Sequence, residues 1–348
     1  MRIACRDLFD AAVKILTACG ETANNAEIAA GNMCRADARG ISTHGVYLLT
    51  PIWKRVKAGQ LTLPTKAVLE ADSGAVAIVN GGDGLGAVAG ELAIRTAMEK
   101  AKQYGVSTVL IKNTNNIGSL ACYTEVAAKA GMIAFMGCNA APAMAPWGGA
   151  EAFLGTNPIA AALYTGNECL FSADMATSVV ARGKIRKAIR DGQTIPDNWA
   201  TDAEGNFTTD PNAAMNGALL PMGSPKGSAL ALIVDILSGM LSGASYAPSL
   251  KSFHETEGPT GVGASLIVID ISRFLPLEDF ARKLDCYKSD IKKIKKAKGF
   301  DEIYMPGEIE YNREQQNLKD GISMENNAVD AINEILKSIG AALIKEKQ

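Results

Sequence analysis

The sequence predicts an α/β protein whose central sheet is covered by helices. Three observations predict this class. The first forty residues repeat apolar side chains at helical spacing, strand and helix patterns alternate from about residue 70, and the charged segment from Leu277 onward again has a helical pattern. Such alternation is typical of a sheet that buries its faces under helices. We therefore expect an α/β core between a helical N-terminal region and a helical C-terminal tail.

The N-terminal region is predicted to hold two helices followed by a turn. Apolar residues of the first helix keep helical spacing, and Gly20 ends this helix. Thr22 or Asn24 can cap the second helix, which is expected to stop near Gly40. A short helix is expected to follow over 47–59.

The core is predicted from apolar runs that alternate with amphipathic stretches. The longest apolar stretch, 229–244, is too short to cross a bilayer and carries Asp235 near its middle, which favours a buried helix. The expected strands are 75–81, 106–112, 132–138, 169–176 and 264–271, and the expected helices are 91–105, 119–131 and 229–244.

Composition and charge exclude several classes of function. The chain has 348 residues, 47% of them hydrophobic, and a net charge of -2, so nothing in its electrostatics favours a nucleic-acid partner. Charge in the first seven residues and the lack of a cleavage-site pattern argue against a signal peptide, and we expect no membrane partner. The seven scattered cysteines contain no CxxC pair, which favours a reducing cytoplasm and predicts no metal site.

A glycine-rich turn at 81–86 resembles a dinucleotide fingerprint. Gly84, Gly86 and Ala89 fit the spacing GxGxxA after a predicted strand. A Rossmann site also needs an acidic residue about 20 positions later, and no Asp or Glu occurs from Ala101 to Thr124. The favoured interpretation is a turn whose glycines let a helix and a strand pack closely.

Lys226 and Gly227 form a weaker candidate for phosphate binding. They precede the long apolar helix, and a helix N-terminus with a lysine attracts anions. The spacing is not that of a Walker loop. A lysine in a surface turn is the alternative.

Three further segments have both functional and structural interpretations. The loop 138–160 holds three prolines and one tryptophan, and long rigid loops are often functional. Segment 174–185 places Asp, Thr, Ser and Lys near a strand end, where a capped turn is the simpler interpretation. His254 lies in a polar loop, and a structural role is favoured for it.

His44 is one of only two histidines and follows the second predicted helix. A lone histidine in a loop is most often structural. An enzyme that moves a proton near neutral pH usually uses an imidazole, however, and this chain offers only two. It has no GxSxG or HExxH motif that would indicate a hydrolase.

Six segments of the chain follow one another in an order that is typical of one enzyme family. They are RADARGISTHGV, APWGGAEAFLGTNPIA, DMATSVVARGKI, IPDNWATDAEGNFTTDP, PKGSALALIVDILSG and YMPGEIEYNREQQNLKDGISM. Together they make the whole chain resemble the malate/L-lactate dehydrogenase family, which is separate from the Rossmann-type lactate and malate dehydrogenases. Relatives within that family are sulfolactate dehydrogenase, ureidoglycolate dehydrogenase, diketogulonate reductase and piperideine-carboxylate reductase. The resemblance implies an NAD(P)-dependent oxidoreductase with a non-Rossmann fold, in which helices flank a mixed sheet, and usually a homodimer.

The resemblance also implies domains and a cofactor site for NAD, with NADP as an alternative. Residues 1–70 would form a helical region that packs with the tail 277–348, and 71–276 would form the cofactor-binding α/β domain. The Pro-rich loop would help to wall the nicotinamide pocket. The implied cofactor-binding residues are Asn139, Asp174, Met175, Ala176, Thr177, Ser178, Lys226, Gly227, Pro306, Gly307 and Glu308.

His44 falls on the histidine of the family's SHG motif, with Thr43 in place of the serine. The resemblance implies that His44 gives a proton to the oxygen or nitrogen formed when hydride arrives, and accepts it in reverse. Thr43 can still hydrogen-bond, although its β-branched side chain is stiffer.

Two positions depart from the family pattern. Leu48 replaces an arginine that reads the substrate carboxylate, and Asn116 replaces a second histidine. Leucine cannot form the arginine–carboxylate fork, and asparagine cannot transfer a proton near neutral pH. The substrate's acid would then be read by another cation, for which the candidates are Lys54, Arg55 and Lys184.

Three functions remain open from the sequence. The first is an NAD(P)-dependent dehydrogenase or reductase of a small 2-oxo acid, 2-hydroxy acid or related carbonyl compound. The second is a cyclic imine reductase with the same fold. The third is a catalytically weak protein that binds the cofactor.

Overall fold

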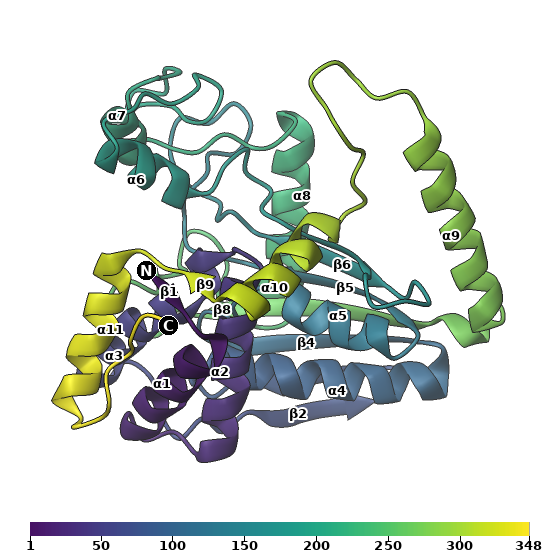
Figure 1. The fold of residues 1–348 in the computed structure, drawn as a ribbon, viewed down its shortest axis with the longest axis horizontal. Coiled ribbons are helices and arrows are strands. Elements are labelled where there is room, and N and C mark those ends of the chain that lie inside the picture. Colours follow the sequence, from purple (N-terminus) through teal and green to yellow (C-terminus); the bar gives the residue numbers. More distant parts are fainter. Residues whose placement is uncertain (348) are drawn as a thin grey trace.

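A seven-stranded mixed sheet forms the centre of the computed structural model, which describes residues 1–347 (Figure 1). β3 and β4 pair in parallel, and the other neighbouring strands of this sheet pair antiparallel. The predicted sheet flanked by helices is confirmed. In spatial order its strands are β2 (Val68–Ser73), β3 (Val76–Asn80), β4 (Val106–Thr114), β8 (Val262–Asp270), β5 (Met132–Cys138), β6 (Ile159–Leu163) and β7 (Phe171–Met175).

Helices α4 and α5 pack on the sheet, and α2 packs against both of them. α4 buries Ile94, Ala97 and Ala101 in the core that it shares with the strands. Thr22 caps α2 by accepting a hydrogen bond from the backbone N–H of Asn25, as one of the two predicted caps. These helices are α1 (Cys5–Ala18), α2 (Ala23–Ala38), α4 (Gly86–Tyr104) and α5 (Ala121–Lys129).

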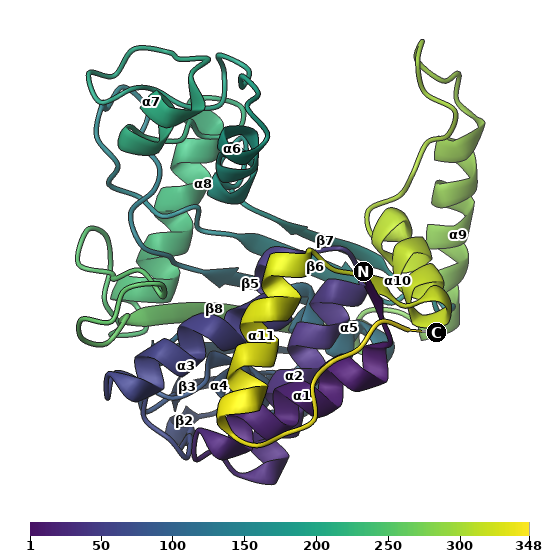
Figure 2. The same ribbon diagram turned by 60° about the vertical axis from the view of Figure 1, so that its left-hand side comes forward.

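The C-terminal helix α11 packs against α1 and α3 and shares an apolar core with the N-terminal helices. Arg2 of β1 pairs with Ser323 of β9, and the two chain ends lie close together (Figures 1 and 2). Where the chain divides into independently folding units stays a prediction. These elements are β1 (Arg2–Ile3), α3 (Leu49–Lys57), α10 (Glu308–Asp320), β9 (Ile322–Ser323) and α11 (Asn326–Ser338).

Helices α6, α7 and α8 and their connecting loops form a lobe that stands away from the N-terminal helices (Figure 2). The lobe has its own apolar core, which includes Met144, Leu154, Ile185 and Leu219. Helix α9 projects from the opposite side of the molecule, and none of its residues is fully buried. These helices are α6 (Arg182–Arg190), α7 (Pro211–Asn216), α8 (Pro225–Asp235), which a π-helical turn (Ile236–Met240) continues, and α9 (Leu277–Lys293).

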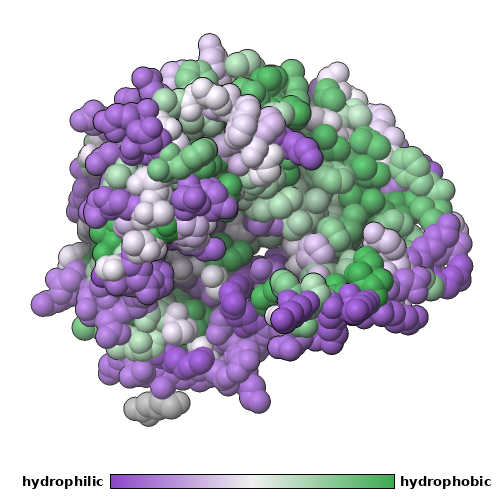
Figure 3. Space-filling view, turned by 90° about the horizontal axis from the view of Figure 1, so that it is seen from above, coloured by the Kyte–Doolittle hydropathy of each residue, from purple (hydrophilic) through white to green (hydrophobic). Residues whose placement is uncertain are grey.

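Helix α8 is not the buried helix that its sequence predicts. It begins at Pro225, and the exposed side chains of α8 and of its π-helical turn include Ile233 at 51% and Met240 at 51% of full exposure. Figure 3 shows that hydrophobic side chains also gather on the surface of the molecule. The prediction was wrong because an apolar composition indicates only that a helix has a surface to bury. It does not indicate whether another part of the same chain covers that surface. Within residues 1–347, no helix is both long and apolar enough to cross a membrane.

The glycine turn before α4 has the packing role that the sequence favours. A Cβ at Gly86 would lie 2.4 Å from the backbone oxygen of Asn116, and one at Gly84 would lie 2.5 Å from the Thr65 side chain. Only glycine lets the start of α4 approach the loop after β4 so closely. This contact fixes one wall of the candidate site.

Candidate active site

His44 ends a short 3₁₀ helix, Ser42–His44, that follows α2. Asp37, on the last turns of α2, accepts a hydrogen bond from the backbone N–H of Val46 at 2.8 Å. A Cβ at Gly45 would lie 1.9 Å from Asp37 Oδ1, so only glycine fits beside this carboxylate. Asp37 and Gly45 together therefore fix the backbone that carries His44.

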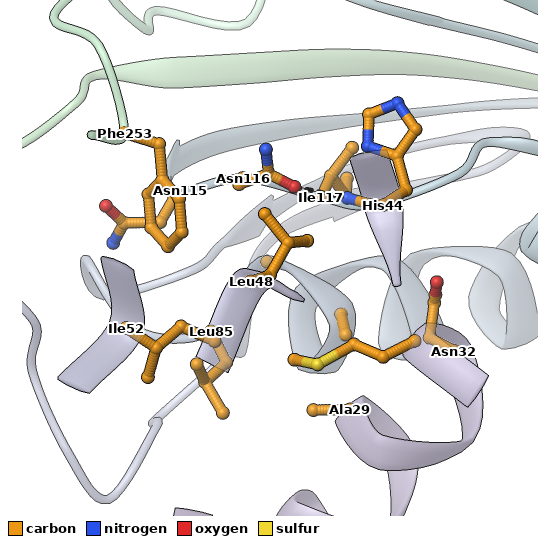
Figure 4. Close-up of a pocket in the computed structure, with 14 residues that line it drawn as sticks. Ala29, Asn32, His44, Leu48, Ile52, Leu85, Asn115, Asn116, Ile117 and Phe253 are labelled. Carbon is orange, nitrogen blue, oxygen red and sulfur yellow. Dashed lines mark hydrogen bonds between the residues drawn. The ribbon is translucent and has the colours of Figure 1, made fainter. Parts of the chain in front are cut away.

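The side chain of His44 lines a pocket between the N-terminal helices and the loop after β4 (Figure 4). Leu48 projects into the middle of this space, and Asn116 and Phe253 lie around it. We call this the His44 pocket. Its lining residues are Ala29, Asn32, Met33, His44, Leu48, Ile52, Leu85, Gly86, Ala87, Asn115, Asn116, Ile117, Gly118 and Phe253.

The surroundings of His44 favour its neutral form. Burial lowers the pKa of the imidazole, and the negative charge of Asp174 opposes that effect only in part. Nδ1 is buried and has no hydrogen-bond partner among the described residues. A half-buried imidazole with a free nitrogen is available to exchange a proton with a bound molecule.

Asp174, at the end of β7, lies near His44 and is held firmly. Its Oδ2 accepts hydrogen bonds from Ser119 Oγ at 2.7 Å and from the backbone N–H of Ala121 at 3.0 Å. These bonds join β7 to the start of α5. The carboxylate therefore stands at a fixed position from which its charge acts on the imidazole.

Asn116 lines the His44 pocket, and Thr43 precedes His44 in the same short 3₁₀ helix. Asn116 Oδ1 accepts a hydrogen bond from the backbone N–H of Gly118 at 2.9 Å, which leaves its amide N–H groups unassigned in the pocket. Thr43 is exposed, and a Cβ at Gly183 of α6 would lie 3.3 Å from its methyl group. The first turn of α6 thus borders the His44 loop.

Several predicted cofactor residues meet where β7 ends and α8 begins. The backbone oxygen of Thr177 accepts a hydrogen bond from Met222 at 2.8 Å, and Ser178 pairs with Pro221. Lys226 follows on the exposed first turn of α8, which no side chain caps, and it has no acidic partner among residues 1–347. A free helix N-terminus with an unpaired lysine fits the pyrophosphate of a dinucleotide. Asp174, Met175 and Ala176 complete this stretch.

Pro306, Gly307 and Glu308 approach β7 from the other side. The backbone oxygen of Pro306 accepts a hydrogen bond from Ser172 at 3.0 Å, and Gly307 begins α10 with a φ of 93°. Although burial raises it, hydrogen bonds from Lys288 and Lys292 bring the pKa of Glu308 down to about 2. The same bonds tie α10 to α9.

Asn139 differs from the other predicted cofactor residues because its side chain is fully committed within the protein. Its amide donates to Asp235 Oδ1 at 3.1 Å and to the backbone oxygen of Ser245 at 2.8 Å. Its oxygen accepts from Gly263 at 2.9 Å. Any contribution of Asn139 to cofactor binding is therefore through the backbone it positions.

The three basic residues predicted to bind a substrate carboxylate differ in whether their charged group is free. Arg55 is fully buried, and it donates to the backbone oxygens of Gln60, Glu255 and Gly258. Lys54 and Lys184 are exposed and form no ion pair within residues 1–347.

Sequence reasoning missed two residues of this region. Asp37 is one, although an acidic residue among the alanines and Met33 of α2 is a visible signal. Arg186 on α6 is the other, since its charge helps burial to lower the pKa of His254. Nothing in its sequence context distinguishes it from the lysines around it.

A second pocket, lined by residues of α2, α5 and α10, is ionic. Arg35 and Arg39 both pair with the buried carboxylate of Glu125, which also accepts a hydrogen bond from Ser172 at 2.5 Å. We call these four residues the Glu125 cluster. Although burial raises it, the two guanidinium groups bring the pKa of Glu125 below its ordinary value. The cluster lines a pocket that also reaches Gly307.

Comparison with known proteins gives one consistent result. The family model described as malate/L-lactate dehydrogenase matches residues 3–333. The chain is 37% identical to the malate dehydrogenase of Pyrococcus horikoshii, over 98% of this chain and 96% of that protein. It is 38% identical to the L-sulfolactate dehydrogenase of Methanocaldococcus jannaschii, over 94% of each chain.

Solved structures agree with the sequence matches. The sulfolactate dehydrogenase of Methanocaldococcus jannaschii superposes with a TM-score of 0.93 over 98% of each chain, at 35% identity. The delta1-piperideine-2-carboxylate reductase of Pseudomonas syringae pvar. tomato superposes with a TM-score of 0.87 over 96% of this chain and 99% of that chain, at 25% identity.

Proposed function

The chain belongs to the malate/L-lactate dehydrogenase family, and on that premise we propose that it interconverts a small 2-oxo acid and its 2-hydroxy acid with a nicotinamide cofactor. It is an NAD(P)-dependent oxidoreductase of CH–OH groups, and we propose that NAD is the cofactor that carries the hydride. The observation that carries the assignment of the active site is His44, a half-buried side chain that lines a pocket and whose Nδ1 is buried and unpartnered among the described residues.

The proposed cofactor site lies along β7. Lys226 and the start of α8 would hold the pyrophosphate, and the backbone from Asp174 to Ser178 would line the path to His44. Pro306, Gly307 and Glu308 would border the far end of the same strand. The bound nicotinamide supplies or accepts the hydride.

His44 is proposed to handle the proton. In reduction, the imidazolium gives a proton to the carbonyl oxygen as that oxygen becomes a hydroxyl, and in oxidation the neutral ring takes it back. Asp174 favours the imidazolium electrostatically and so opposes the effect of burial. Asn116 would orient the carbonyl through its amide N–H groups. The apolar wall excludes water from the reacting atoms.

A cyclic imine is the second candidate substrate. The similarity to a piperideine-carboxylate reductase supports it, and the same imidazolium can protonate a nitrogen. The third possibility is a protein that binds the cofactor without turnover, and the experiment below separates it from the other two.

The experiment measures loss of NADH and NADPH absorbance against a panel of 2-oxo acids and cyclic imines, with the wild type and His44→Ala. We expect turnover with a 2-oxo acid, preferentially with NADH, and a fall of about 10²- to 10⁴-fold in kcat for His44→Ala. NADH binding, followed by fluorescence, should be retained. Turnover that survives His44→Ala would assign the proton transfer to another group. NADH binding without any turnover would select the third possibility.

We also propose that the protein is a homodimer, in the cytoplasm. The exposed apolar side chains of α8 and its π-helical turn support a subunit interface, because a second copy would bury them. The seven free cysteines fit a reducing compartment. Light scattering should give twice the mass of the chain, and Ile233→Asp should shift it toward the monomer. A monomeric wild type at micromolar concentration would contradict the dimer.

A further inference from the structure

No lysine or arginine lines the His44 pocket, and His44 is the only titratable side chain among its lining residues. Its wall around Leu48 is built from Ile52, Leu85, Met33 and Phe253. Of its three amides, Asn115 is already committed to the backbone oxygens of Asp83 and Gly84 and to Thr260. A carboxylate pushed against Leu48 would lose its hydration without gaining an ion pair, which is costly. The wall is suited to an apolar group.

Basic side chains lie instead on elements that adjoin this pocket. Lys54 is exposed on α3, the helix that also supplies Ile52, and His254 directly follows Phe253. The ring of His254 is 6.2 Å from that of Tyr47, in the same loop as His44. Arg186 lies on α6, whose first turn borders Thr43. We call Lys54 and Arg186 the rim cations, and His254 is the neutral polar side chain on which both charges act.

The rim cations lack neutralising partners. Neither Lys54 nor Arg186 forms an ion pair anywhere in the part of the chain that the structure describes, whereas Lys187 and Arg190 of α6 pair with Asp191 and Glu325. Burial, and then the charges of Arg186 and Lys54, lower the pKa of His254, which shows that these charges act on the same place. Unpaired positive charge beside a pocket attracts an anion.

We propose that the substrate is a 2-oxo acid, or a cyclic imino acid, with an apolar side chain that packs against Leu48 while its carboxylate is held by the rim cations, chiefly Arg186. This inference rests on the proposed function and adds the substrate class and the residue that reads the acid. His44 would then stand between the two ends of the substrate, next to the carbon that accepts the hydride.

The test compares kcat/KM for 4-methyl-2-oxopentanoate and oxaloacetate, with NADH, in the wild type, Arg186→Ala and Lys187→Ala. Delta1-piperideine-2-carboxylate is included as the cyclic imino acid. We expect the wild type to prefer the apolar substrates. Arg186→Ala should raise KM for them about 10- to 100-fold through loss of a charge-assisted hydrogen bond, with kcat and NADH affinity nearly unchanged. Lys187→Ala, one residue away on the same exposed helix, should leave KM unchanged.

A second variant tests the apolar wall. Leu48→Arg adds a cation inside the pocket and should reverse the preference toward oxaloacetate, with folding checked by circular dichroism. A wild type that prefers oxaloacetate, or equal KM values for Arg186→Ala and Lys187→Ala, would overturn the inference while the turnover itself upholds the proposed function. Bound NADH without turnover on any of the three substrates would overturn both.

Discussion

Two buried carboxylates, one on α2 and one on α5, have opposite electrostatic surroundings. Asp37, beside the His44 loop, receives one backbone hydrogen bond and no cation, and burial raises its pKa to about 7. Glu125, on α5, is held by two guanidinium groups that outweigh burial and lower its pKa. Paired charge here stabilises structure, whereas unpaired groups near His44 remain free to respond to protons and ligands.

The pH dependence of stability should differ in sign between the two. The pKa of Asp37 is raised on folding, so its contribution to stability is fully present below pH 4 and is lost as the pH rises toward 7. The pKa of Glu125 is lowered, so its contribution is present above the ordinary pKa of a glutamate and is lost as the pH falls. Substitution of either carboxylate therefore tests this difference between the two sites.

The largest effect is expected from Glu125→Ala. This change leaves Arg35 and Arg39 buried without their partner and should lower the free energy of unfolding by about 3–5 kcal/mol, measured by urea denaturation. Glu91→Ala removes a carboxylate from a more exposed ion pair with Arg95 and is the control. It should change the free energy of unfolding by less than about 0.5 kcal/mol. Equal losses in the two variants would mean that the Glu125 cluster does not stabilise the fold.

Asp37→Asn should make the free energy of unfolding less dependent on pH. In the wild type, the unfolding free energy should fall between about pH 4 and pH 7, by up to about 4 kcal/mol at 1.4 kcal/mol per unit of pKa shift. The asparagine can still accept the hydrogen bond of Val46 but cannot ionise, so the variant should lack that component. Parallel curves for the two proteins would show that Asp37 ionises normally.

Gly86→Ala should distort the wall of the His44 pocket. The added Cβ would lie 2.4 Å from the backbone oxygen of Asn116, and such overpacking costs about 1–3 kcal/mol. We expect lower thermal stability together with reduced kcat/KM. Gly31→Ala is the matched control, because a Cβ in that part of α2 meets nothing within 4 Å, and it should stabilise the helix by about 0.5–1 kcal/mol.

The smallest change is expected from Asp174→Asn, and it concerns only proton affinity. Without the carboxylate, burial alone acts on His44, so its pKa should fall further. The kcat/KM for reduction needs the imidazolium and should therefore decline at lower pH than in the wild type. The pH profile of the initial rate measures this shift, and NADH affinity is determined alongside. An unchanged profile would show that Asp174 does not act on the proton donor.

The helices and most strands follow from the sequence because their apolar residues keep a clear period. β6 was not predicted, because the small side chains of Ile-Ala-Ala-Ala-Leu show no alternation of apolar and polar residues. β2 was not predicted either, because all of its residues are exposed and the strand has no buried apolar face. Helices α6 and α7 are short, and the arginines and lysines of α6 show little apolar periodicity.

The candidate site was predicted unevenly for a similar reason. His44 could be placed in a turn after a helix because it is rare and Gly40 ends that helix. Arg186 could not be associated with it, because α6 is far away in sequence and its cations look alike without their neighbours. Arg55 and Lys54 are adjacent in sequence, yet one is buried and committed while the other is free.

The sequence by itself determined the α/β class, the family, the glycine turn and the histidine that we propose as the proton donor, because these depend on local patterns and rare residues. Only the tertiary structure decided which charges are paired. It buried Asp37 without a cation, joined Glu125 to two arginines, exposed much of α8 and brought the first turn of α6, the helix that carries Arg186, beside the His44 loop. The physical reason is that burial and pairing depend on contacts between distant segments, and those contacts set the energy of each charge.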